Sequence, residues 1–293
     1  MTTLRINSWN VGQAYSREST EPERMYIEHQ IEKNDPDVVF LAEVTTDPAI
    51  PESFSDGFEK RLGYTVISAV RATDSEQDIF MKRNGVKVLN ILAHRDLPDL
   101  EVTAVDLAGR SMFEAIYGGG LPLAFTHLDS WLASNRHRSV QQLLNRYGDK
   151  PSDQPLIVAG DLNSMPAAAR SPALSVLRSA PLHQLTQTAA NLGALPEKLR
   201  RPINIVRRLA EAATDDVFEM FEQAGVVNLS VGDIRPTFDG RSAHRLGRHV
   251  RLPLDHVLGR GNGSSYQAGP VKVTETPHSL GLDHYRQAVD IEV

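Results

Sequence analysis

Residues 156–163 read Leu-Ile-Val-Ala-Gly-Asp-Leu-Asn, an apolar run that ends in a glycine, an acid and an amide. The apolar residues predict a short strand. Gly160 permits a tight exit from that strand. Asp161 and Asn163 lie two residues apart, so on an extended chain both side chains would point into one pocket, where aspartate can bind a metal or accept a proton and asparagine can donate to phosphate. Because Gly, Asp and Asn are also turn formers, the run alone is equally consistent with a plain turn.

Other predicted strand ends carry groups of the same kind. The run 4–10 alternates as a strand does and ends at Asn10. Glu43 ends the continuous apolar run 38–42, so its carboxylate would emerge at a sheet edge, although taken alone it fits a surface glutamate beginning a loop better. His127 follows the predicted strand 121–126 and could donate to a phosphoryl oxygen or be bonded within a loop.

Two Asp-His pairs lie near the C-terminus. Asp255-His256 opens a predicted strand, and Asp283-His284 precedes the last one. An aspartate bonded to an imidazole fixes its tautomer and raises its basicity, which gives a base near neutral pH. Adjacent residues point apart on a strand, so we expect the pair to form across strands, between Asp255 and His284, with His256 structural.

A dense basic stretch immediately precedes Asp255 in an otherwise acidic protein. Its arginines are Arg235, Arg241, Arg245, Arg248 and Arg251. The guanidinium fork matches phosphate oxygens, which makes Arg235 and Arg251 candidate substrate-phosphate contacts. A solvated loop paired with surface acids is the alternative.

Composition narrows the chemistry further. The 293 residues can bury a substantial core, and 41% hydrophobic with 23% charged residues is ordinary for a soluble globular protein. Without cysteine there is no disulfide-linked partner or thiolate ligand, so a metal would be held by oxygen or imidazole, which favours Mg²⁺, with Mn²⁺ or Ca²⁺ as alternatives. No apolar run is long enough to span a membrane and the N-terminus lacks the features of a signal peptide, so we expect a cytoplasmic location.

The order of predicted elements favours antiparallel or mixed sheets covered by helices rather than strict βαβ winding. Helices are predicted at about 20–34, 54–62 and 131–147, and strands at about 64–70, 86–92, 101–107, 121–126, 254–258, 271–276 and 288–293. Gly118-Gly119-Gly120 most simply marks a turn. Between about 165 and 228 helix patterns recur, at 203–213 and 217–224, and strand signals vanish, which suggests an insertion.

Taken together, the sequence resembles the endonuclease/exonuclease/phosphatase superfamily of metal-dependent phosphoesterases. The markers, in family order, are Ser8-Trp9-Asn10, Leu41-Ala42-Glu43-Val44, Thr126-His127-Leu128, Gly160-Asp161-Leu162-Asn163, Pro236-Thr237-Phe238, Leu254-Asp255-His256-Val257 and Asp283-His284. The resemblance implies a four-layer α/β sandwich, with two mixed β-sheets face to face and helices on the outside. It also implies a single domain over residues 1–293 with a helical insertion at about 165–228.

The resemblance also implies roles. Glu43 would hold the catalytic Mg²⁺, supported by Asn10 and Asp283. Asp161 would orient or deprotonate the attacking water. His284, oriented by Asp255, would be the other candidate base or a phosphate contact. Asn163 and His127 would bind phosphoryl oxygens.

The expected activity is that of a magnesium-dependent phosphodiesterase, a hydrolase that uses in-line attack of water. The leading hypothesis is a nuclease, endonuclease or exonuclease, acting on DNA or RNA. The alternative is a phosphatase or phosphodiesterase of a small phosphorylated substrate such as a phosphoinositide, a nucleotide or a phospholipid headgroup. The acidic net charge of −6 and an aromatic content of only 6% favour this alternative. A catalytically silent binding module is the minor alternative.

Overall fold

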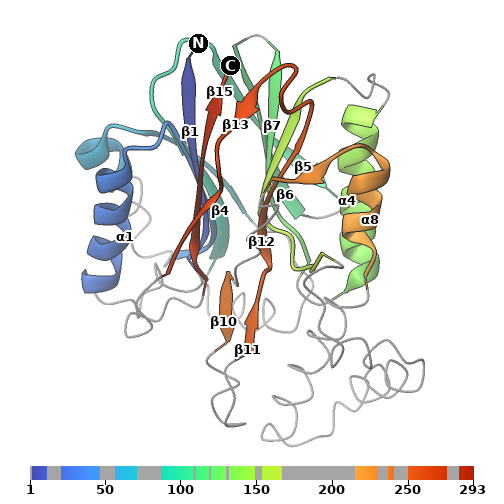
Figure 1. The fold of residues 1–293 in the computed structure, drawn as a ribbon. Coiled ribbons are helices and arrows are strands. Elements are labelled where there is room, and N and C mark those ends of the chain that lie inside the picture. Colours follow the sequence, from blue (N-terminus) through green and yellow to red (C-terminus); the bar gives the residue numbers. More distant parts are fainter. Residues whose placement is uncertain are drawn as a thin grey trace, which may run out of the picture.

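The computed structural model describes residues 2–11, 21–46, 57–70, 87–107, 110–118, 120–129, 132–148, 154–166, 215–229, 237–240, 250–275 and 284–293. Over these ranges the chain forms two β-sheets packed face to face, with helices on both outer sides (Figure 1). No helix in these ranges is long and apolar enough to cross a membrane.

The first sheet contains both ends of the chain. Its seven strands are β1 (Thr3–Asn10), β2 (Val38–Thr46), β3 (Thr65–Val70), β4 (Lys87–His94), β13 (Gln267–Ala268), β14 (Lys272–Thr274) and β15 (Arg286–Glu292). The strand order is β13-β15-β1-β2-β4-β3, and β14 also pairs with β15. β1 and β2 are parallel, whereas the other pairs are antiparallel. A parallel pair needs a crossover, which helix α1 (Glu21–Asn34) supplies.

The second sheet has six strands in the order β5-β6-β7-β8-β12-β9. They are β5 (Leu100–Leu107), β6 (Arg110–Tyr117), β7 (Leu121–His127), β8 (Leu156–Asp161), β9 (Val227–Asn228) and β12 (Asp255–Arg260). β7 and β8 are parallel and are connected through helix α4 (Ala133–Gly148), while the remaining pairs are antiparallel.

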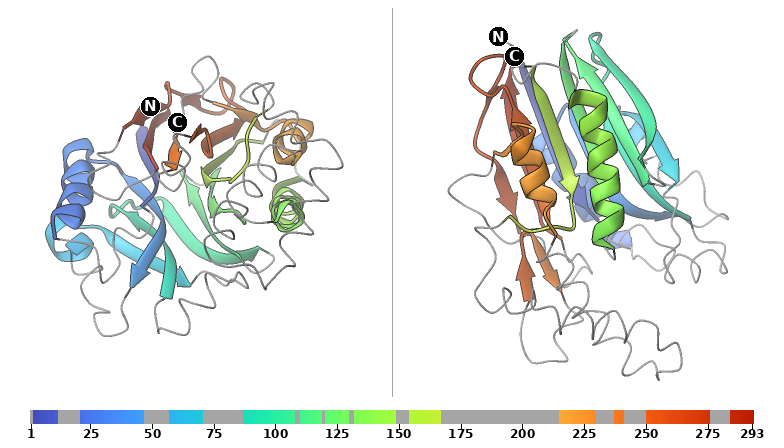
Figure 2. Two further views of the ribbon diagram at one scale, coloured as in Figure 1. Left: turned by 90° about the horizontal axis from the view of Figure 1, so that it is seen from below. Right: turned by 90° about the vertical axis from the view of Figure 1, so that its right-hand side faces the viewer.

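Three hydrophobic cores separate four layers. The central core, which includes Phe113, lies between the two sheets. A second core, which includes Ile31, joins the first sheet to α1 and to the π-helical turn η1 (Gly57–Arg61). A third, which includes Leu143, joins the second sheet to α4 and to helix α8 (Val217–Gln223). The view from below shows both sheets between these outer helices (Figure 2). The predicted four-layer α/β sandwich is confirmed.

Strand β2 shows why a continuous apolar run was required here. Val38, Phe40 and Ala42 belong to the core between the sheets, whereas Val39 and Leu41 belong to the core under α1. Because both faces of the strand are covered, both sets of alternating residues are apolar.

Two short strands, β10 (Phe238–Gly240) and β11 (Val250–Leu252), form a separate antiparallel hairpin that extends beyond the sheets (Figure 1). Only Pro253 and Leu254 separate β11 from β12, so the base of the hairpin lies beside Asp255. The arginine-rich residues 241–249 lie outside the described ranges.

Most predicted elements are confirmed, with shifts of a few residues at their ends. The main error is β6 (Arg110–Tyr117), which was not predicted. Its polar residues Arg110, Ser111 and Glu114 interrupt the apolar pattern, although Arg110 and Ser111 are buried. The predicted turn at Gly118 is confirmed, since Gly118 has φ +59° and β6 and β7 form a hairpin around it. In the helix predicted at 54–62, residues 54–56 lie outside the described ranges and Gly57–Arg61 is π-helical.

The predicted insertion at 165–228 is described only near its ends, because residues 167–214 lie outside the described ranges. The helix expected in its last part is confirmed as α8. The expectation that strands vanish throughout is wrong at Val227–Asn228, which form β9 and pair with β12. The single-domain organisation with a helical insertion stays a prediction.

Candidate active site

Polar side chains replace apolar ones at one end of the second sheet. Along β7, Phe125 belongs to the central core and His127 continues the same face two residues later. Along β8, Ala159 and Asp161 follow the same rule. The strand register pairs His127 with Asp161, and Asp161 with Asp255. Three candidate residues therefore lie in one row across three neighbouring strands.

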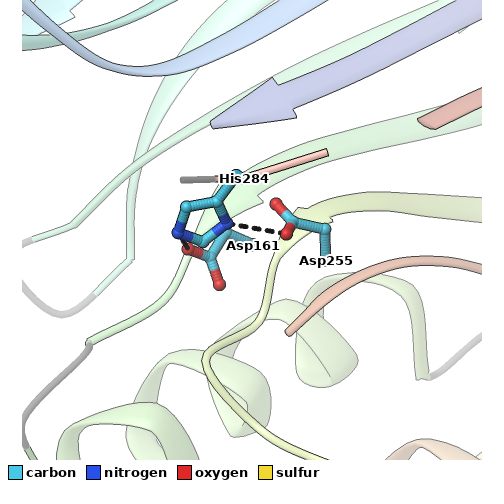
Figure 3. A group of neighbouring side chains, drawn as sticks. All are labelled: Asp161, Asp255 and His284. Carbon is cyan, nitrogen blue, oxygen red and sulfur yellow. Dashed lines mark hydrogen bonds and ion pairs between the residues drawn. The ribbon is translucent and has the colours of Figure 1, made fainter. Parts of the chain in front are cut away.

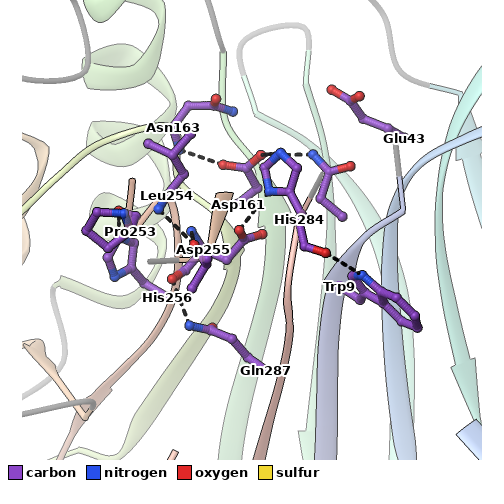
Figure 4. A network of polar contacts seen from close by, with 12 residues as sticks. Trp9, Glu43, Asp161, Asn163, Pro253, Leu254, Asp255, His256, His284 and Gln287 are labelled. Atoms are coloured by element: carbon purple, nitrogen blue, oxygen red, sulfur yellow. Dashed lines mark hydrogen bonds and ion pairs between the residues drawn. The ribbon is translucent and has the colours of Figure 1, made fainter. Parts of the chain in front are cut away.

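Asp161 is the centre of this arrangement. Its Oδ2 accepts a hydrogen bond from Nδ2 of Asn10, at 2.9 Å, which links the first sheet to the second. The same oxygen lies 3.7 Å from Nε2 of His127 and 3.9 Å from Nε2 of His284. Its Oδ1 accepts the backbone N–H of Asn163 at 2.9 Å. The buried carboxylate is thus close to two imidazoles, and Figure 4 shows the ring of His284 beside it.

Gly160 allows β8 to reach this position. Its φ is +142°, and a Cβ at this residue would lie 1.9 Å from the backbone oxygen of Thr126 on β7. The two strands approach too closely for any side chain. The glycine before Asp161 is therefore required by packing between strands.

Asn163 is close to Asp161, but for a different reason from the one predicted. The strand ends at Asp161, and Asn163 has φ +49°, so the extended geometry assumed for the two residues is wrong. The side chain of Asn163 donates from Nδ2 to the backbone oxygen of Leu128 at 3.1 Å. It thereby connects the loop after β8 to the loop after β7.

Asp255 and His284 form the predicted cross-strand pair. Nδ1 of His284 is 2.8 Å from Oδ2 of Asp255, and both residues are buried (Figure 3). The carboxylate makes Nδ1 the protonated nitrogen and directs Nε2 toward Asp161. The prediction that these two residues pair is confirmed.

Three further residues hold this pair in place. Nε1 of Trp9 donates to the backbone oxygen of His284 at 3.1 Å, and Nε2 of Gln287 donates to the backbone oxygen of Asp255 at 2.8 Å (Figure 4). Oγ1 of Thr237 accepts the backbone N–H of Asp255 at 2.8 Å. The imidazole is therefore oriented by contacts on both sides.

Glu43 reaches the site through an irregularity in β2. The pairing of β2 with β4 shifts register between Leu41 and Val44, and Glu43 has φ +59°. Strict alternation would direct the residue after Ala42 toward α1, because Leu41 faces that side. Instead, Oε1 of Glu43 lies 3.5 Å from Nε2 of His127 on the opposite sheet. A left-handed conformation costs a non-glycine residue roughly 1–3 kcal/mol and is typical of functional positions.

The electrostatics of the site are dominated by buried negative charge. Burial, and after it the charge of Asp255, raise the pKa of Asp161 to about 7, although His284, Asn10 and Asn163 oppose the rise. Asp161 is thus suited to exchange a proton near neutral pH. A positive charge nearby would favour its ionised form.

The donors around this space suit a hard divalent cation. Glu43 offers a carboxylate whose side chain is 30% exposed, Asn10 an amide oxygen and Asp161 a second carboxylate, and the sequence contains no thiolate. A second geometric candidate exists, because ligand atoms of Asp161, Asp255 and His284 lie within 4.8 Å of one another (Figure 3). Asp255 and His284 of this cluster are already hydrogen-bonded to each other, which suits the cluster better to orienting an imidazole.

The remaining predicted residues have different outcomes. His256 is structural as expected: its ring is buried, Nε2 lies 2.8 Å from the backbone oxygen of Pro253, and burial lowers its pKa to about 4. Arg235 and Asp283 lie outside the described residues. For Arg251 the structure describes only the backbone, in β11.

Sequence reasoning assigned no role to Thr237 or Gln287. Thr237 was noted only as part of a family marker, and its two-sided contact with Asp255 and Tyr285 depends on tertiary structure. Gln287 lies on the same inward face of β15 as Val289 and Ile291. A polar residue in this otherwise apolar alternation is a signal that sequence reasoning could have used.

Comparison with known proteins agrees with this fold. A model of the Endonuclease/Exonuclease/phosphatase family matches residues 8–277. The chain therefore belongs to this family of phosphoesterases. No curated protein sequence matches it significantly.

Solved structures with the same fold are distant in sequence. D. rerio TDP2, described as complexed with single strand DNA product, is 18% identical, with 100% of both chains covered and a TM-score of 0.58. An AP endonuclease from Archaeoglobus fulgidus is 14% identical, with 98% of both chains covered and a TM-score of 0.56. An endonuclease/exonuclease/phosphatase from Beutenbergia cavernae is 15% identical over 100% of this chain and 72% of that one, with a TM-score of 0.58.

Proposed function

We propose that this protein is a divalent-metal-dependent phosphodiesterase that hydrolyses its substrate by in-line attack of an activated water. The observation that carries the proposal is a convergence of groups from both sheets. Glu43 and Asn10 of the first sheet, with His284 just before β15, meet His127, Asp161 and Asp255 at the end of the second. Carboxylates, amides and imidazoles at one point are the groups that phosphoester hydrolysis needs.

The metal would be held by Glu43 and Asn10, with Asp283 as a third ligand. Mg²⁺ suits this set because it takes oxygen ligands and keeps several waters, and the exposed side of Glu43 leaves room for them. When bound, the metal stabilises charge on the phosphoryl oxygens and on the leaving group. Mn²⁺ and Ca²⁺ take similar ligands.

Asp161 is the proposed general base. Its raised pKa and its place between two imidazoles allow it to accept the proton of the attacking water. His284, oriented by Asp255, is the alternative base through its unprotonated Nε2, and once protonated it would donate Nε2–H to a phosphoryl oxygen. His127 and the Asn163 loop would contact the remaining phosphoryl oxygens.

A nucleic acid is the proposed substrate. The hairpin of β10 and β11 lies next to Asp255, and arginines cluster in its sequence and just before it, from Arg235 to Arg251. Among the structural neighbours, one TDP2 is described with a single strand DNA product and another protein as an AP endonuclease. A small phosphorylated substrate is the second candidate, favoured by the net charge of −6. The cytoplasmic location stays a prediction from the sequence.

The experiment that separates these substrates uses plasmid, single-stranded DNA, RNA and a panel of phosphorylated metabolites, each with Mg²⁺ or Mn²⁺. Asp161→Asn serves as the inactive control. A nuclease should cleave a polynucleotide, and its apparent affinity should fall steeply as salt rises because arginine–phosphate contacts release counterions. Cleavage of a metabolite alone, with weak salt dependence, would favour the small substrate.

A further inference from the structure

A buried ion pair contacts the two loops that follow β7 and β8 at the candidate active site. Arg136 of α4 and Asp215, which precedes α8, contact each other through Nε and Oδ2, and both side chains are 0% exposed. Buried charges lose much of their attraction to desolvation, so such a pair is weak evidence for stability alone. Its contacts on each side suggest another role.

On one side, Arg136 holds the loop that follows β7. Its Nη1 donates to the backbone oxygen of Asp129 at 2.7 Å, two residues after His127. The carboxylate of Asp129 accepts the backbone N–H of Leu132 at 3.0 Å and contacts Nη2 of Arg110 at 2.9 Å. The segment that carries His127 is therefore fixed to α4 and to β6.

On the other side, the ion pair holds the loop that follows β8. Oγ of Ser164 donates to Oδ1 of Asp215, although 51 residues separate the two in sequence. Ser164 follows Asn163 directly, and its backbone oxygen lies 3.2 Å from Nε2 of His256 on β12. The bond from Asn163 to the backbone oxygen of Leu128 then joins the two loops to each other.

We propose that Arg136 is a positioning residue for phosphate binding. Together with Asp215 it sets the distance between the loops of His127 and Asn163, the two side chains assigned to phosphoryl oxygens. The inference rests on the proposed function. It adds that the ion pair controls binding of the phosphate group while touching neither substrate nor metal.

The test replaces both charges at once, as Arg136→Met with Asp215→Leu. Removing a whole buried pair is tolerated far better than removing one partner, so the double variant should fold. The matched control is Arg5→Met with Asp290→Leu, an ion pair between β1 and β15 whose side chains are 44% and 37% exposed. For each protein we would measure KM and kcat for bis-nitrophenyl phosphate with Mn²⁺, and inhibition by inorganic phosphate.

In the double variant KM should rise, which should lower kcat/KM by roughly 10- to 100-fold, the usual effect of a small misplacement of a binding group. The inhibition constant of phosphate should rise as well. The Arg5 and Asp290 control should match the wild type. Ser164→Ala, which keeps the ion pair but loses its link to the Asn163 loop, should show a smaller change in the same direction. Unchanged KM and phosphate inhibition in the double variant would overturn the proposal.

Two further outcomes are distinguishable. If the wild type itself shows no metal-dependent hydrolysis, the proposed function fails, and the positioning role is read from hydrogen exchange instead. The N–H of Leu128 and of Asn163, which bond to Asp161, should then exchange faster in the double variant than in the control. If the double variant does not fold, Ser164→Ala decides the matter, and wild-type KM in Ser164→Ala would contradict the inference.

Discussion

Single residues in unusual backbone conformations determine where the functional groups lie. Glu43 has φ +59° at a register shift in β2, and this turns its carboxylate toward His127. Strained non-glycine residues often occur at functional sites, which supports the metal-binding role proposed for Glu43.

We therefore predict that two substitutions of Glu43 have the same effect on activity but different effects on stability. Glu43→Gly and Glu43→Ala should both abolish metal-dependent hydrolysis, because both lack the carboxylate. Glu43→Gly should be more stable than Glu43→Ala by about 1 kcal/mol, since glycine adopts positive φ without steric cost. Urea denaturation of the two variants measures the difference, and equal stability would show that the conformation is not strained.

Gly160 gives a second test at this scale. Gly160→Ala would place a Cβ 1.9 Å from the oxygen of Thr126, so β7 and β8 must separate. We expect a loss of about 3 kcal/mol in the free energy of unfolding and a loss of activity through displaced Asp161. Gly120→Ala is the control, because nothing lies within 4 Å of a Cβ there. Similar stability for the two variants would contradict the account.

How far these residues could be predicted from sequence depends on whether the chain stays regular. The Asp255–His284 pair followed from the alternation of side chains on strands, and the structure confirms it. Glu43 and Asn163 depart from regular geometry, with φ +59° and +49°. A bulge and a left-handed residue leave no periodic signal, so their side-chain directions could not be read from the pattern.

At the scale of elements, the site depends on how strand ends are joined. Thr237, at the start of β10, accepts the N–H groups of Leu254 and Asp255 with Oγ1, at 2.9 and 2.8 Å. Its backbone oxygen accepts the N–H of Tyr285 at 2.6 Å. One residue thus connects the hairpin, the start of β12 and the chain that carries His284.

Thr237→Val should damage this junction without changing its shape. Two buried N–H groups would lose their acceptor, at a cost of about 1–3 kcal/mol each, and kcat should fall as the Asp255–His284 pair loses its alignment. Thr237→Ser keeps the hydroxyl and should restore both properties. Thermal unfolding and steady-state kinetics of the two variants provide the measurement, and a fully active Thr237→Val would argue against this role.

The same scale explains the missed strand. β6 carries Glu114, whose carboxylate accepts hydrogen bonds from Arg146 and Tyr147 of α4. The partners that make a charged residue acceptable in this strand come from a helix more than thirty residues later, so the local pattern gave no sign of them. The strands and helices with regular apolar spacing, such as β2 and α4, were predicted correctly.

For the molecule as a whole, folding stability should depend on pH through His256. Burial lowers its pKa from 6.5 to about 4, so the unfolded chain binds a proton that the folded protein excludes. As pH falls from 6.5 toward 4, this residue should lower the free energy of unfolding by up to about 1.4 kcal/mol per pH unit. Above pH 6.5 its contribution should be constant.

Denaturation of wild type and His256→Gln between about pH 7 and about pH 5 isolates this effect. Because the raised pKa of Asp161 acts in the opposite direction over the same range, the effect of His256 is measured as a difference: as pH falls, the free energy of unfolding of the variant should rise relative to that of the wild type. The control, His29→Gln, changes an exposed residue of α1 and should keep the wild-type dependence. Identical slopes for wild type and His256→Gln would contradict the assignment of a buried, neutral imidazole.

The central claim is that one site, assembled from both sheets, hydrolyses phosphodiesters with a divalent metal. Its most direct test is the initial rate of bis-nitrophenyl phosphate hydrolysis as a function of Mg²⁺ or Mn²⁺ concentration, for wild type, Glu43→Gln and Asp161→Asn. The account predicts a saturable, metal-dependent rate in the wild type, a weakened metal dependence in Glu43→Gln and almost no rate at any metal concentration in Asp161→Asn. A wild-type rate that is absent, or that is the same in all three proteins, would contradict it.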